Sequence, residues 1–190
     1  MILPSRCASR VVIVGSSCAG KTTFAQALAQ ARSCVCVDLD DLFWGPDWTP
    51  QPQAEFLRSV AQAATGDTWV VAGNYGTARD ILWSRTTTVV WLNFSLPLLL
   101  WRGVRRTVKR VVSRQELFQG NRESFRRAFL SRESILWWIV STHGRRRLEF
   151  ERLRASGHFP QIEWMEARNP TEAAAILQAL QQGPSGDAPF

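Results

Sequence analysis

Near the amino end, glycine, lysine and threonine recur at a spacing that can hold phosphate. The motif is Gly15-x4-Gly20-Lys21-Thr22, with a short apolar run before it and helical apolar spacing after it. In such a loop the backbone N–H groups turn inward around phosphate oxygens, and the start of the next helix adds a favourable dipole. Lysine brings positive charge to the β- and γ-phosphates, and the threonine hydroxyl is a ligand for Mg²⁺. The residues expected to bind ATP or another nucleoside triphosphate with Mg²⁺ are Gly15, Ser16, Ser17, Cys18, Ala19, Gly20, Lys21, Thr22 and Thr23.

Two aspartates follow the second apolar run and could supply the acidic groups that phosphoryl transfer needs. Asp38 and Asp40 stand directly after 34–37. The carboxyl end of a parallel strand beside a phosphate loop is where ligands bind in open α/β sheets. We predict that Asp38 and Asp40, with Thr22, organise the metal and that Asp40 also acts on the acceptor. The next acid, Asp41, is expected only to cap a turn.

The later strand ends offer no further carboxylate. The third strand ends in Ala72-Gly73-Asn74-Tyr75 and the fourth in Asn93. Asn74 and Tyr75 bring hydrogen-bonding and stacking groups to the same rim, so they are predicted to contact the acceptor. Trp44, in a loop rich in glycine and proline, is predicted to wall the acceptor pocket.

Strands and helices alternate along the chain. Apolar runs typical of buried strands cover 10–14, 34–37, 68–72, 87–94 and 161–166, and helical spacing covers 24–32, 54–64 and 171–181. This order predicts an α/β fold of the P-loop NTPase kind, a five-stranded parallel sheet with helices on both faces. We expect one domain over 1–182 and a flexible tail over 183–190. The region from about 96 to 155 is almost wholly helical, with breaks expected at 119–121 and 143–144.

Composition points to a soluble globular protein, with 45% hydrophobic and 21% charged residues in a chain of 190. The longest apolar stretch, 89–101, is interrupted by polar residues and proline and is shorter than the ~20 residues that cross a bilayer. The run 11–14 is too short for a signal-peptide core. The four cysteines form no CxxC pair, which favours reduced thiols. We therefore expect a cytoplasmic protein without membrane contact.

Positive charge gathers in one segment. Residues 102–154 hold 15 Arg or Lys and 5 Asp or Glu, a net of +10, whereas the other 8 basic and 11 acidic residues sum to −3. Such a segment is expected to meet an anion, and nucleic acid is a possible partner. Arginines at 102, 106, 110 and 114 form one helical stripe, whose alternative interpretation is a solvated basic face. Arg145–Arg147 is expected to be solvated, and His143 structural.

The order and spacing of the motifs resemble the adenylate-kinase-related P-loop proteins known as DNA topology modulation, or FlaR-like, proteins. The resemblance covers nearly all of 10–180. The matching motifs are the phosphate loop, Leu39-Asp40-x-Leu-Phe-Trp44-Gly-Pro-x-Trp48, Trp69-Val-Val-x-Gly73-Asn74-Tyr75, Val90-Trp-Leu-x-Phe94, Glu116-Leu-Phe-x-Gly120-Asn121-Arg122-Glu123 and Ser134-Ile-Leu-Trp137 with Thr142-His143. It implies the fold of nucleoside monophosphate and shikimate-type kinases.

The resemblance also implies roles for arginines. In kinases of this shape the helical segment before the last strand is a lid, whose arginines close over the transferring phosphoryl group and help to exclude water. Arg106 and Arg110 are the implied catalytic arginines. Arg122 is the next candidate and is implied to contact the substrate. Arg79 is implied to contact the acceptor, and the backbone at Arg168 to contact the adenine ring.

The chain departs from this family at two positions. The family usually has aspartate where this chain has Ala72 and Asn93. Shikimate-type kinases also lack the first acid and use a DxD motif on the second strand, which Asp38-Leu39-Asp40 resembles.

The leading prediction is therefore an ATP- and Mg²⁺-dependent kinase that acts on a small acceptor, a nucleotide or another hydroxyl compound. Lys21 and the lid arginines would stabilise the transferring group. A nucleic-acid-binding NTPase or DNA topology modulator is the alternative suggested by the basic segment, although no recognition helix, zinc pattern or RNA motif accompanies it. A catalytically weak nucleotide-binding regulator is the alternative suggested by Ala72 and Asn93.

Overall fold

Five parallel strands form the centre of the protein. The computed structural model describes residues 9–113 and 135–182. The strands are β1 (Arg10–Gly15), β2 (Val35–Asp38), β3 (Trp69–Ala72), β4 (Thr88–Leu92) and β5 (Glu163–Ala167). They are hydrogen-bonded in the order β2-β3-β1-β4-β5, with every pair parallel. The predicted five-stranded parallel sheet is thus confirmed, and β1 lies in the middle of it.

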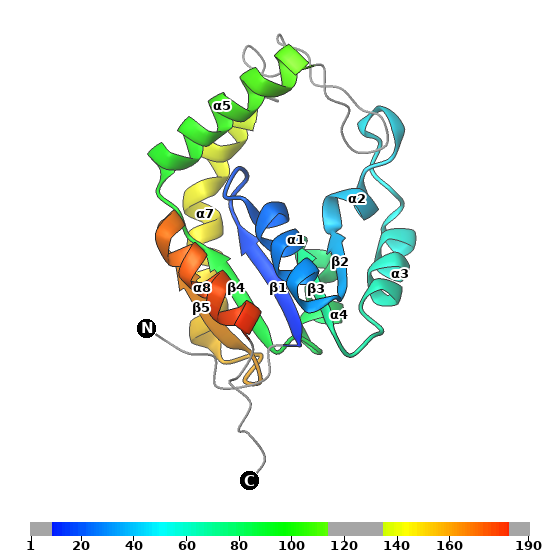
Figure 1. Ribbon diagram of the computed structural model, residues 1–190. Helices are drawn as coiled ribbons and strands as arrows, with labels where there is room; N and C mark the ends of the chain where they lie inside the picture. The colour runs from blue at the N-terminus through cyan, green and yellow to red at the C-terminus, as the bar shows by residue number, and fades with distance from the viewer. Residues whose placement is uncertain (1–8, 114–134, 183–190) are drawn as a thin grey trace.

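Helices cover both faces of this sheet (Figure 1). On one face α1 (Lys21–Arg32) and α8 (Pro170–Gln182) pack against the sheet, and on the other α3 (Gln53–Ala63), α4 (Arg79–Trp83) and the second half of α7 (Ile135–Ser156) do so. Successive β1 residues alternate between the two cores, with Val11 and Ile13 in one and Val12 and Val14 in the other. Both faces of the central strands β1, β3 and β4 are buried, which is why these strands are continuous apolar runs.

The remaining elements stand near the carboxyl ends of the strands. They are α2 (Leu39–Phe43), the 3₁₀ turns η1 (Pro46–Trp48) and η2 (Gly76–Ala78), and α5 (Leu96–Ser113). In Figure 1, α5 and the start of α7 lie together at the upper left and α2 at the right, with the β1–α1 loop between them. Gly103 of α5 makes this pairing close, because a Cβ there would lie 3.0 Å from Leu136 and 3.2 Å from Ile139 of α7.

Glycine is required where β1 turns into the loop. Gly15 has φ +146°, and a Cβ there would lie 2.6 Å from the carbonyl oxygen of Leu92 on β4. Any larger residue would push the loop away from the neighbouring strand.

The structure corrects one predicted helix break and one strand boundary. The break expected at 143–144 is wrong, because α7 runs unbroken through Gly144. One exposed glycine costs a helix only about 1 kcal/mol relative to alanine, and Ile139, Thr142 and Phe150 on either side are buried. The second strand ends at Asp38, so Asp40 belongs to α2 and not to the strand.

Other boundaries moved by a few residues. The final helix begins at Pro170, and the Asn169 side chain just before it accepts a hydrogen bond from the Glu172 N–H at 2.9 Å. The predicted break at 119–121 and the tail at 183–190 lie outside the described residues. Within 9–113 and 135–182, no helix combines the length and the apolar character needed to span a bilayer.

Candidate active site

The Gly15–Thr22 loop joins the central strand to the start of α1. Cys18 and Gly20 both have positive φ, 65° and 95°, and the Ala19 N–H donates to the Ser16 carbonyl at 3.2 Å, which folds the loop into a tight turn. The ammonium group of Lys21 donates back across the loop to the same carbonyl, at 3.2 Å. Burial lowers the pKa of Lys21 from its ordinary value. The lysine therefore stands at the mouth of a loop that curls as a phosphate cradle does.

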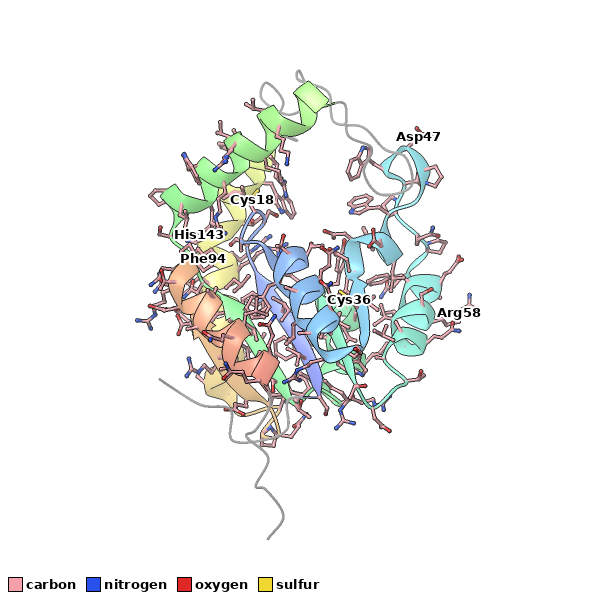
Figure 2. The ribbon with its side chains drawn as sticks, in the orientation of Figure 1. Cys18, Cys36, Asp47, Arg58, Phe94 and His143 are labelled. Atoms are coloured by element: carbon pink, nitrogen blue, oxygen red, sulfur yellow. The ribbon has the colours of Figure 1, made fainter. Side chains whose placement is uncertain are left out.

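Three other segments hold this loop in place. The Asn74 side chain, after β3, accepts from the Gly15 N–H at 3.1 Å and donates to the Gly15 carbonyl at 2.5 Å. Arg102 of α5 donates to the Ala19 carbonyl at 3.0 Å. A 3.3 Å hydrogen bond joins Ser16 Oγ to His143 Nδ1 on α7, which Figure 2 shows close to Cys18 at the loop tip. The amide of Asn74, predicted for the substrate, is thus used to position the loop.

Thr22 and Asp38 bring their oxygens together at the start of α1. The Thr22 hydroxyl donates to Asp38 Oδ2 at 2.5 Å, and the other Asp38 oxygen accepts from the Asp40 N–H at 3.0 Å, so that Asp38 caps α2. Burial raises the pKa of Asp38.

These oxygens are the donor type that Mg²⁺ prefers, and Mg²⁺ is usually held by one or two carboxylates plus substrate phosphates. Among the described residues no group of three or more His, Cys, Asp or Glu side chains could hold a metal by itself. The donor set therefore fits a metal shared with a nucleotide.

Asp40 faces the same space from the first turn of α2. The Tyr75 hydroxyl donates to Asp40 Oδ1 at 2.6 Å. Burial, together with the negative charge of Asp40, raises the pKa of Tyr75, so the phenol keeps its proton. No hydrogen bond from the described part of the chain reaches Asp40 Oδ2. That oxygen remains able to accept a proton from a bound hydroxyl.

Aromatic rings line the α2 side of the site. Tyr75 packs against Phe43 with 4.7 Å between ring centroids, and Phe43 meets Trp44 edge-on at 4.9 Å. Trp44 in turn meets Trp48 at 5.8 Å, in a hairpin where Trp48 has an unusual positive φ of 57°. The predicted pocket wall at Trp44 is therefore part of a continuous aromatic row that reaches Tyr75.

The arginines predicted for the site differ in their burial and in their partners. Arg106 of α5 is half-buried, and its Nε has no hydrogen-bond partner in the described part of the chain. Arg79 forms an ion pair with Glu149 of α7 and stacks over Trp83, 5.3 Å from the ring centroid. Arg168 lies at the carboxyl end of β5, where its backbone N–H donates to Glu172 at 2.7 Å. The Arg110 side chain and Arg122 lie outside the described residues.

Two residues that were not predicted for the site are brought to it by α7. Arg146 was expected to be solvated, but it is half-buried, and it lines a pocket with Ser16, Asn93 and His143. Arg146 lies four residues before buried Phe150 and seven after buried Ile139. Helical spacing alone could thus have placed it on the inner face. The hydrogen bond from His143 to the loop left no signal in the sequence.

Asn93, which stands where FlaR-like proteins usually have aspartate, has a hydrogen-bond partner in the structure. The Asn93 amide donates to Glu166 Oε1 at 2.8 Å, at the ends of β4 and β5. An aspartate would place two carboxylates side by side there. Ala72 is buried beside Asp38 in the register of β2 and β3.

Three arginines of the basic segment have partners within the protein. Arg147 contacts Glu151 at 3.0 Å, and Arg154 contacts Glu166 at 3.4 Å. Arg102 is committed to the phosphate loop. Nucleic-acid binding by this segment stays a prediction, which a steep fall of DNA affinity with salt would support.

The parallel sheet, its strand order and the loop after β1 define a P-loop kinase fold of the shikimate kinase and gluconokinase type. No protein-family model and no curated protein sequence matches the chain. A shikimate kinase from Acinetobacter baumannii, solved in complex with shikimate, is similar over 92% of this chain and 91% of its own, with 16% identity and a TM-score of 0.52. A gluconokinase from Sinorhizobium meliloti 1021 is similar over 94% and 92%, with 18% identity and a TM-score of 0.52.

A shikimate kinase from Bacteroides thetaiotaomicron is also similar, with 16% identity, a TM-score of 0.51 and coverage of 92% of this chain and 97% of its own. At these identities the likeness concerns the fold. The closer resemblance to FlaR-like proteins stays a prediction.

Proposed function

We propose that this protein transfers the γ-phosphoryl group of a nucleoside triphosphate, expected to be ATP, to a hydroxyl group of a small acceptor. One observation carries the proposal. The loop lysine, the Thr22–Asp38 pair and the Asp40–Tyr75 pair converge at the carboxyl end of the sheet, where Lys21 interacts electrostatically with both aspartates. A donor, a metal and an acceptor each have matching groups within one site.

The reaction balances with these groups. The acceptor oxygen forms a bond to the γ-phosphorus while the bond from that phosphorus to the β–γ bridging oxygen breaks, and a nucleoside diphosphate leaves. The acceptor proton passes to Asp40 Oδ2. A carboxylate accepts this proton in other phosphoryl transfers as well. The Tyr75 hydroxyl holds the other Asp40 oxygen and so orients the carboxylate.

The remaining groups stabilise charge. Lys21 and the N–H groups of the loop would bind the β- and γ-phosphates. Thr22 and Asp38 would hold Mg²⁺, which when bound neutralises the charge that develops on the phosphate oxygens. Arg106 would contribute from α5, where its Nε has no hydrogen-bond partner in the described part of the chain.

The test is ADP release in the presence of a collection of hydroxy compounds. Lys21→Ala should lower turnover by at least about a thousandfold, because it removes the positive charge that stabilises the transferring phosphoryl group. The far-ultraviolet circular dichroism spectrum, which reports on secondary structure, should not change. Lys109→Ala is the matched control, since the only other lysine is exposed on α5. Equal turnover in Lys21→Ala and the wild type would reject the proposal.

Calorimetry separates the kinase from a regulator that only binds nucleotide. A kinase should bind ATP and release ADP with at least one acceptor. Tight ATP binding without product from any acceptor would favour the regulator instead.

A further inference from the structure

Arg102 of α5 is held between the phosphate loop and the end of β4. Its Nη1 donates to the carbonyl oxygen of Ala19 in the loop, at 3.0 Å. Its guanidinium lies over the ring of Phe94, which is buried just after β4, with 5.1 Å to the ring centroid. The face of an aromatic ring attracts a positive charge. The two contacts together fix the guanidinium against the outside of the loop.

The contact with Ala19 sets the direction of the next N–H group. The carbonyl of Ala19 and the N–H of Gly20 belong to one peptide unit, and in a planar trans peptide these two groups point in opposite directions. No peptide bond in the described part of the chain is cis. Because Arg102 holds the carbonyl toward α5, the Gly20 N–H is turned away from α5.

The Gly20 N–H is available to a ligand. Among residues 9–113 and 135–182 it has no hydrogen-bond partner, and Gly20 stands directly before α1 with φ +95°. A side chain is also absent there, and a Cβ would lie 3.6 Å from Nη1 of Arg102. An N–H group at this place is the first of those that the start of α1 offers to an anion.

The other carbonyls near the start of the loop are held in the same manner. The Gly15 carbonyl accepts from the Asn74 side chain, and the Ser16 carbonyl accepts from Lys21 and from the Ala19 N–H. When carbonyls are bound by the protein, the N–H groups of the same peptide units are left to line an anion-binding concavity. Arg102 extends this arrangement to the last peptide before α1, from a different element.

We propose that Arg102 is a positioning residue for phosphate binding, which acts by holding the Ala19 carbonyl so that the Gly20 N–H points at the phosphates of the nucleotide. The proposal rests on the proposed function and adds the device that orients its phosphate loop. Arg102 thus differs from Arg106, one turn further along α5, to which contact with the transferring group is assigned.

Calorimetric titration of ATP and of inorganic tripolyphosphate gives the first test. Arg102→Met keeps a long apolar side chain against Phe94 but removes the donor, so it should weaken binding of both ligands by the same factor, about 10- to 100-fold, as expected for a lost hydrogen bond to a charged group. Arg102→Lys keeps a donor and the charge, so it should recover part of the loss.

Arg105→Met is the matched control. Arg105 is exposed on the same helix and lies over the ring of Trp101, 5.5 Å from the centroid, but away from the loop. This variant should bind both ligands as the wild type does. Wild-type binding by Arg102→Met would overturn the proposal, since packing alone would then suffice. A loss for ATP without a loss for tripolyphosphate would overturn it as well, because Arg102 would then contact the nucleoside.

Nuclear magnetic resonance separates positioning from direct contact with phosphate. Labelling only glycine with ¹⁵N leaves twelve backbone signals, and the one that disappears in Gly20→Ala belongs to Gly20. Saturating tripolyphosphate should move the Gly20 amide proton downfield in the wild type, and by less than half as much in Arg102→Met. An equal shift in both proteins, with weaker binding in the variant, would show that Arg102 touches the phosphate itself and would overturn the proposal.

The two proposals can fail separately. If ATP and tripolyphosphate bind as described but no acceptor is phosphorylated, the proposed function fails and the role of Arg102 stands. If the wild type turns over and Arg102→Met binds both ligands equally well, the positioning role is wrong and the kinase proposal stands. If the wild type binds neither ligand, both are wrong.

Discussion

At the scale of single residues, the site depends on side chains that hold other side chains. Tyr75 is the clearest example, because its hydroxyl is a hydrogen-bond donor to Asp40 and its ring packs among Phe43 and Phe56. Its raised pKa keeps it a donor over the whole working range of pH. The hydroxyl of Tyr75, which orients Asp40, can therefore be removed without removing the Tyr75 ring from its packing.

Tyr75→Phe tests this separation. The substitution removes one hydrogen bond to a charged group, so we expect kcat to fall about tenfold and nucleotide affinity to change by less than twofold. The ring remains, and the free energy of unfolding should change by no more than about 1–2 kcal/mol. A loss of nucleotide affinity as large as the loss of kcat would contradict the assignment to the acceptor side.

Cys18 reports on the phosphate loop directly. It is half-buried in the loop, whereas Cys36 is exposed on β2. ATP should slow the alkylation of Cys18 by iodoacetamide at least about fivefold and leave Cys36 unaffected, as followed by mass spectrometry of each peptide. Equal labelling of Cys18 with and without nucleotide would show that ATP does not cover the loop.

At the scale of elements, the contact between α5 and α7 positions Arg102, His143 and Arg146 around the loop. The two helices approach at Gly103, where a Cβ would also lie 3.6 Å from the Cys18 sulfur. Gly144 is in the same pair of helices but has nothing within 4 Å of a built Cβ. The two glycines therefore separate helix propensity from packing.

Alanine at these two positions should have opposite consequences. Gly144→Ala should raise the free energy of unfolding by about 0.5–1 kcal/mol, because it gains helix propensity in open space. Gly103→Ala gains the same propensity but crowds Leu136 and Ile139, so its net effect should be near zero or destabilising by about 1 kcal/mol. Urea denaturation measures both, and equal stabilisation by the two substitutions would mean that the helices are not packed at Gly103.

At the scale of the whole molecule, Glu166 connects the ends of β4 and β5 to α7. It accepts from Asn93 and contacts Arg168 at 3.0 Å and Arg154 of α7 at 3.4 Å. Burial opposes ionisation, but the hydrogen bonds from Arg168 and Asn93 and the two positive charges outweigh it and lower the pKa of Glu166. A carboxylate with a lowered pKa in the folded state contributes stability above its unfolded pKa, which is lost as the pH falls through the folded pKa.

Asn93→Asp and Glu166→Gln test this connection. At pH 7 Asn93→Asp should destabilise the fold by about 1–2 kcal/mol, because it replaces a hydrogen bond with two adjacent negative charges. The destabilisation should shrink as the pH falls below about 4, where carboxylates take up protons. In the Glu166→Gln background the cost of Asn93→Asp should largely disappear. Chemical denaturation at pH 7 and pH 3.5 gives all these values, and a pH-independent cost would contradict the argument.

What the sequence determined by itself was local. Short-range spacing predicted the β1–loop–α1 unit and the buried parallel strands, because each depends on neighbours within a turn or two. The place of Asp38 and Asp40 directly after the second apolar run also followed from local order.

Only the tertiary structure decided which distant side chains meet. The fold commits Asn74 to the backbone of Gly15, brings His143 to Ser16 across 127 positions, and turns Arg146 inward from a run of arginines. The unbroken course of α7 past Gly144 was also decided there, since packing on both sides outweighs the weak preference of one glycine. Contacts across the sheet and between helices depend on how whole elements pack, and no spacing along the chain encodes them.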